Sequence, residues 1–92
     1  MPYMYILHSD QLDRFYVGQT TGPIEERLRR HLSSNKGFTA KARDWKVVYS
    51  EAFNTKEEAA SRERQVKAWK SRTAIERLLM SQHASAGSEH SD

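Results

Sequence analysis

Two short stretches near the start of the chain, Tyr3-Met4-Tyr5-Ile6-Leu7 and Phe15-Tyr16-Val17, decide the fold. Both are rich in aromatic, β-branched and large apolar residues, which favour β-strands. Between them, Ser9-Asp10-Gln11-Leu12-Asp13 has the polar composition of a turn. The sequence therefore predicts an antiparallel β-hairpin at the start of the domain.

The next elements follow from their boundary residues. Pro23 suits the first position of a helix, and Glu25 and Glu26 follow where the helix dipole favours negative charge. We predict a helix over residues 23–33, an exposed loop over 33–44 and a strand over 45–53. Two patterns with the form of capping boxes, Thr55 to Glu58 and Thr73 to Glu76, predict helices over 56–70 and 74–81. The expected fold class is α+β, a small three-stranded, mainly antiparallel sheet flanked by helices in the order β-β-α-β-α-α.

Length and composition predict one domain over residues 1–81. Residues 82–92 consist of Ala, Ser, Gly, Gln, His and acids without apolar periodicity, so we expect them to be disordered. The chain has no cysteine, which excludes disulfides and a cysteine nucleophile and fits a reducing cytoplasm. The longest apolar or aromatic run, Tyr3 to Leu7, is far shorter than the ~20 residues of a membrane span. We expect a soluble, cytoplasmic protein that does not act at a membrane.

The charge is basic, with fifteen Lys and Arg against twelve Asp and Glu. Two of the acids, Glu89 and Asp92, lie after residue 81, so residues 1–81 carry fifteen basic and ten acidic residues, a net charge of +5. Such a domain suits phosphate backbones, although many proteins with no nucleic-acid partner are equally basic.

Helical periodicity singles out two polar residues of the predicted helix at 23–33. Successive residues are about 100° apart, so Ile24, Leu28 and Leu32 form an apolar stripe that Arg27 and His31 border. Arg29 and Arg30 fall on the solvent side. Two roles stay open for the bordering pair: simple packing at the edge of the core, or a site built with neighbouring side chains.

Glu63 lies inside the apolar sector of the predicted helix at 56–70. A carboxylate turned toward a core requires a partner, which is either an arginine such as Arg27 or a divalent cation. Tyr3 and Tyr5 share one face of the first strand, and Tyr16 lies across the hairpin. These tyrosines either pack in the core or converge with Arg27 and Glu63.

Taken together, these residues resemble the GIY-YIG nuclease superfamily, in particular its small single-domain members, over residues 3–80. The half-motifs are Tyr3-Met4-Tyr5 and Tyr16-Val17-Gly18. The family's helical arginine and histidine, four residues apart, match Arg27 and His31, and its metal-binding glutamate matches Glu63. The first half-motif lacks glycine and isoleucine, and the asparagine that many family nucleases carry beyond the glutamate has no match, because the only asparagines are Asn35 and Asn54.

The resemblance implies a metal-dependent endonuclease that hydrolyses phosphodiester bonds in nucleic acid, with DNA as the expected partner and no small-molecule cofactor. It implies that Glu63 holds Mg²⁺ or Mn²⁺ and that Arg27 neutralises charge on the reacting phosphate. Tyr5 or Tyr16 would orient or deprotonate the attacking water, and His31 would accept a hydrogen bond from a tyrosine or relay its proton. Gly18 would allow a close approach of a backbone or of the phosphate.

For the substrate surface we expect Lys36, Lys41 and Arg43 of the loop, with Phe38 or Trp45 as stacking partners; a solvated loop whose aromatics close the core is the alternative. Two other functions stay open. The missing asparagine motivates a nucleic-acid-binding module of the same fold with little or no cleavage, and the basic surface also suits a protein-interaction domain with an acidic partner.

Overall fold

The structure of the protein, a computed structural model, describes residues 1–33 and 37–91, without the side chains at 38–39 and 82–91. Three strands form an antiparallel sheet in the order β2-β1-β3: β1 (Tyr3–Ser9), β2 (Arg14–Thr20) and β3 (Lys46–Ala52). The helices are α1 (Ile24–Ser33), the short 3-10 helix η1 (Phe38–Lys41), α2 (Lys56–Trp69) and α3 (Arg72–Ser91). The predicted fold class and the order β-β-α-β-α-α are confirmed.

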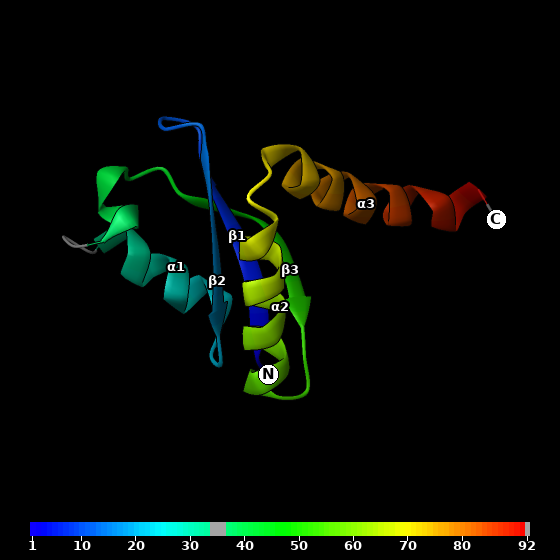
Figure 1. Ribbon diagram of the computed structural model, residues 1–92, viewed down its shortest axis with the longest axis horizontal. Helices are drawn as coiled ribbons and strands as arrows, with labels where there is room; N and C mark the ends of the chain where they lie inside the picture. The colour runs from blue at the N-terminus through cyan, green and yellow to red at the C-terminus, as the bar shows by residue number, and fades with distance from the viewer. Residues whose placement is uncertain (34–36, 92) are drawn as a thin grey trace.

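The sheet carries apolar side chains on both faces. On one face Tyr5, Leu7, Ala42 and Trp45 are buried against the apolar stripe of α1, which consists of Ile24, Leu28 and Leu32. On the other face Met4, Ile6 and Val17 are buried against Val66 of α2 and against Ile75 and Leu78 in the first half of α3. Figure 1 shows the result, with α1 on one side of β2 and α2 on the other. The edge strand β2 therefore runs between two helices.

The hairpin turn is held by a long-range contact that sequence periodicity does not predict. Ser9, which is fully buried, donates from its hydroxyl to Asp44 Oδ1 at 2.6 Å and accepts from the Leu12 amide at 3.1 Å. The other oxygen of Asp44 accepts the Gln11 amide at 2.8 Å. The segment before β3 thus fixes the turn between β1 and β2.

Helix boundaries agree with the capping signals at α2 and differ at α3. Thr55 and Glu58 form the predicted capping box, with the Glu58 amide 3.2 Å from the Thr55 hydroxyl. At α3 the predicted cap at Thr73 is wrong, because the Ser71 hydroxyl accepts the Ala74 amide at 3.2 Å and the helix begins at Arg72, two residues before the predicted start at 74.

At its other end α3 continues past residue 81 to Ser91. The packing of residues 82–92 involves side chains outside the described residues, so the division between a domain at 1–81 and a tail stays a prediction. Within the described residues, no helix has the length and apolar character that a membrane crossing requires.

Candidate active site

The centre of the candidate site is the pairing of Tyr5 with Gly18 across the hairpin. The two residues are directly opposite in the β1–β2 register, and Tyr5 is only 1 % exposed. A Cβ on residue 18 would lie 2.6 Å from the Tyr5 hydroxyl oxygen, 2.7 Å from its Cζ and 3.1 Å from Tyr16 Cε2. Because atoms cannot approach so closely, only glycine leaves room for the Tyr5 phenol over β2. The prediction for Gly18 named a backbone or the phosphate as the approaching group, whereas in the structure a tyrosine ring lies against it.

From one side, α1 places Arg27 and His31 against these tyrosines. Both are half-buried, whereas Arg29 and Arg30 are exposed, as the helical periodicity predicted. The Tyr5 hydroxyl lies 2.9 Å from His31 Nε2. The imidazole also meets the Tyr16 ring edge-on, with ring centres 5.0 Å apart. His31 therefore joins the two strand tyrosines.

Burial keeps both partners of this hydrogen bond uncharged. Burial raises the pKa of Tyr5 above its ordinary value of 10.0, and the Arg27 guanidinium only partly opposes this. Burial, together with the charge of Arg27, lowers the pKa of His31 below 6.5. At neutral pH a protonated phenol thus faces a neutral imidazole, and Tyr5 donates to Nε2 in the tautomer that carries its N–H on Nδ1.

From the other side, α2 contributes Glu63 and Lys67. The Glu63 side chain is 19 % exposed, and its carboxylate pairs with Lys67 Nζ at 3.0 Å, one helical turn further on. The same ammonium lies 5.9 Å from the centre of the Tyr16 ring. Glu63 is also near enough to Tyr5 for its charge to contribute to the raised pKa of that phenol. Residues from α1, both hairpin strands and α2 therefore meet around β2.

The partner of Glu63 corrects one sequence-based alternative. Among the described residues no carboxylate forms a salt bridge with Arg27, so the ion pair of Glu63 with Arg27 is wrong. Lys67 takes its place. It was not among the predicted site residues, although a lysine four residues after a glutamate is a familiar helical pair.

Two residues of the predicted substrate surface, Arg43 and Trp45, make contacts within the domain. Trp45 is 3 % exposed and belongs to the core, so the structure supports core closure for this residue and not base stacking. Arg43 Nη1 donates to the Leu32 carbonyl at 2.9 Å, at the C-terminal end of α1. Lys41 is exposed at the end of η1. Lys36 and the side chain of Phe38 lie outside the described residues.

The donor set determines which metal ion the site suits. Among the described residues no three His, Asp or Glu side chains gather into a metal cluster. Mg²⁺, however, keeps several waters and often takes one or two carboxylates together with substrate phosphates. A single half-buried carboxylate fits that mode, and Glu63 is the residue that would hold the ion.

The fold and the site define a small basic α+β domain with a polar site built across one sheet edge. A family model described as the GIY-YIG catalytic domain matches residues 1–77 of the 92-residue chain, and the chain belongs to this family. The family indicates a nuclease-type domain. Comparisons with curated proteins and with solved structures gave no match.

Proposed function

We propose that the protein is a divalent-metal-dependent endonuclease that hydrolyses phosphodiester bonds, with DNA as its substrate. The observation that carries this proposal is the convergence of Tyr5, Arg27, His31 and Glu63 beside Gly18, with Tyr16 completing the group. Membership of a nuclease-type family supports it. In hydrolysis, the oxygen of a water forms a new bond to phosphorus, the bond to one ester oxygen breaks, and that oxygen gains a proton.

Each side chain has a role that follows from its surroundings. Arg27 neutralises the charge that grows on the phosphate oxygens, since its guanidinium has no acidic partner among the described residues. Tyr5 is buried and keeps its proton, so it positions His31 and does not act as a base. Tyr16 is the more exposed of the two tyrosines and is the one that orients the attacking water. A divalent ion held by Glu63 would polarise the phosphate and stabilise the leaving oxygen.

The decisive test is Glu63→Gln. Exposed helical pairs of the i,i+4 kind contribute only about 0.3–0.5 kcal/mol, and in this pair the Lys67 side chain is half exposed while Glu63 is half-buried. Because glutamine also keeps the shape of the side chain, the variant should stay folded with only a small loss in the free energy of unfolding. Its amide is a far weaker ligand for a hard cation, so Mn²⁺-dependent nicking of plasmid DNA should disappear while DNA binding persists. Glu57→Gln, on the exposed side of the same helix, should nick at the wild-type rate.

A second substitution tests the arginine. Arg27→Ala should reduce nicking at least a hundredfold, because mutational losses of one transition-state donor are about 10²–10³. Arg29→Ala removes the same charge from the exposed face of α1 and should have little effect. Equal losses in the two variants would remove Arg27 from the site.

A nucleic-acid-binding module without cleavage is the second candidate, and two observations favour it. First, Glu63 already pairs with Lys67. Second, the only asparagines are Asn35 and Asn54. Asn54 lies in the turn before α2, where its backbone N–H donates to the Glu58 carboxylate. If wild-type protein binds DNA in Mn²⁺ but never nicks plasmid or branched substrates, this second function replaces the first.

A further inference from the structure

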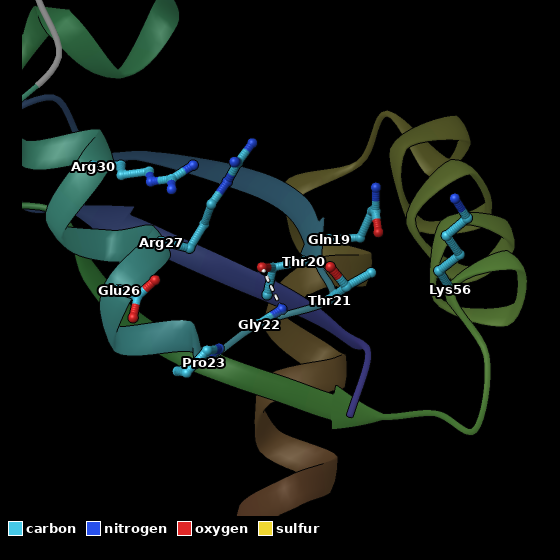
Figure 2. A pocket seen from close by; sticks show the side chains of 9 residues that line it. All are labelled: Gln19, Thr20, Thr21, Gly22, Pro23, Glu26, Arg27, Arg30 and Lys56. Atoms are coloured by element: carbon cyan, nitrogen blue, oxygen red, sulfur yellow. Dashed lines mark hydrogen bonds between the residues drawn. The ribbon is translucent and has the colours of Figure 1, made fainter.

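A cleft of about 430 Å³ opens at the end of β2, next to the candidate active site. Figure 2 shows that three elements build it: Arg27 and Arg30 reach in from α1, Gln19 to Thr21 form its floor, and Lys56 stands at the start of α2. Arg27 thus belongs both to the active site and to this cleft. The lining residues are Gln19, Thr20, Thr21, Gly22, Pro23, Glu26, Arg27, Arg30 and Lys56.

The charge of the cleft is strongly positive. Three cations face one carboxylate, that of Glu26, and none of the described carboxylates forms a salt bridge with Arg30 or Lys56, both of which are exposed. Holding three like charges together without counter-charges is unfavourable in the free protein. An anion entering the cleft would relieve this repulsion.

Two residues of the cleft, Arg27 and Gln19, carry unsatisfied polar atoms. Arg27 Nε and Gln19 Oε1 are buried and have no hydrogen-bond partner. A buried donor without an acceptor is costly, and Nε–H is a donor only, so an anionic oxygen is its natural partner. The Gln19 amide can turn by 180° to present its NH₂ group to the same anion. Thr20 accepts the Gly22 amide at 3.2 Å, which leaves its hydroxyl hydrogen available.

The position of Lys56 relates the cleft to the active site. At about 100° per residue, Glu63 and Lys67 lie within roughly 20° of Lys56 around the α2 axis. Seven residues at ~1.5 Å each place Lys56 about 10 Å from Glu63 along the helix. One stripe of α2 therefore faces both the carboxylate of the active site and the cleft.

We propose that this cleft binds a second phosphodiester group of the same strand, next to the one that is cut. The substrate class is then nucleic acid with at least two consecutive phosphodiesters, and a single diester fills only half of the binding surface. The inference rests on the proposed function, because Arg27 is shared between the two phosphates. The recognition is of backbone phosphate and carries no base preference.

The test measures binding to short oligothymidylates by the Glu63→Gln protein, which cannot turn over its ligand. The probes are TpT, with one phosphodiester, and TpTpT, with two, titrated by NMR at low salt. We expect the second phosphodiester to raise affinity about tenfold, the effect of roughly 1.4 kcal/mol from a charge-assisted contact. Adding Arg30→Ala and Lys56→Ala should abolish this increment, so that TpT and TpTpT then bind with equal affinity.

Arg29→Ala with Arg77→Ala is the matched control, since it removes two exposed positive charges that do not line the cleft. It should leave the increment intact. The proposal is overturned if the increment is absent, if it survives in the Arg30 and Lys56 variant, or if the control abolishes it equally. If the wild-type protein shows the increment but nicks no DNA, the proposed function is wrong and the phosphate site stands. If it nicks DNA but shows no increment, the phosphate site is wrong and the proposed function stands.

Discussion

Gly18 is the residue on which the candidate site depends most directly. The β1–β2 register fixes its backbone beneath Tyr5, and a methyl group at residue 18 would overlap the phenol, so Gly18→Ala must displace that ring from His31. We expect a loss of about 1–3 kcal/mol in the free energy of unfolding, typical of overpacking. Cleavage should fall at least tenfold.

Urea unfolding and plasmid nicking measure the two effects. Gly22→Ala is the stability control, because a Cβ on residue 22 meets no atom within 4 Å. A Gly18→Ala protein with wild-type stability and activity would mean that Tyr5 and His31 do not need their observed positions.

His31 makes the stability of the domain sensitive to mild acid. Its pKa is lowered in the folded protein, so below about pH 6.5 the unfolded chain binds a proton at His31 more readily than the folded chain does. The free energy of unfolding should therefore decrease as pH falls from 7 toward 5. A protonated His31 carries a hydrogen on Nε2, so it can no longer accept from Tyr5 and must donate to the phenol oxygen instead. Because this changes how the pair is held, nicking should weaken over the same interval.

In His31→Gln the free energy of unfolding should decrease less between pH 7 and 5 than in the wild type, measured by urea unfolding at several pH values. His8→Gln changes a histidine of the hairpin away from this site and should show the same decrease as the wild type. A decrease that is unchanged in His31→Gln would assign the acid sensitivity to other groups.

At the scale of elements, a polar network joins β3 to α2 on the face of the sheet opposite α1. Glu51 accepts from the Tyr49 hydroxyl, from Arg62 Nε at 3.1 Å and from Arg62 Nη2 at 3.2 Å. The guanidinium carbon of Arg62 lies 5.6 Å from the Trp69 ring centre. Burial, followed by the Glu51 carboxylate, raises the pKa of Tyr49 to about 12.

This network predicts a loss of stability in alkali. The folded protein keeps the Tyr49 proton up to a higher pH than the unfolded chain, whose tyrosine titrates near 10.0. The free energy of unfolding should therefore fall as pH rises from 10 toward 12. Tyr49→Phe should make this fall shallower, measured by denaturant unfolding, whereas Tyr3→Phe should not. A fall of equal steepness in both variants would contradict the assignment.

Local patterns predicted the elements and their buried faces because helical and strand periodicity depend on neighbouring residues alone. Arg27, His31 and Glu63 are half-buried as predicted, and the Thr55 capping box is present. Pairings between distant residues were not predictable in this way. The register that sets Tyr5 over Gly18 and the contact of Arg43 with the end of α1 depend on how the elements meet.

At the scale of the whole molecule, the first half of α3 contacts the domain. Ile75 and Leu78 pack against the core, and Arg72 donates to the Asp13 carbonyl at 2.9 Å and to its carboxylate at 2.6 Å. Figure 1 shows the helix running away from the sheet toward the C-terminus.

We therefore expect deletion of residues 82–92 to leave the thermal midpoint within about 5 °C of the full chain, a change worth roughly 1 kcal/mol for a domain of this size. Arg72→Ala in the full chain instead removes the contacts with Asp13 and so tests the half of α3 that packs on the domain. A larger drop on deletion than about 5 °C would show that the last residues pack onto the domain.

The central position of β1 has a consequence for the order of folding. On one side β1 pairs with β2 through a tight turn, and on the other it pairs with β3, where His8 meets Lys46. Closing the longer segment costs roughly 2 kcal/mol more in chain entropy than closing the turn, at about 0.6 kcal/mol per doubling of length. The hairpin, with Tyr5 already over Gly18, is thus the natural nucleus. Until β3 arrives, the open edge of β1 can pair with other chains, so refolding yield should fall as protein concentration rises.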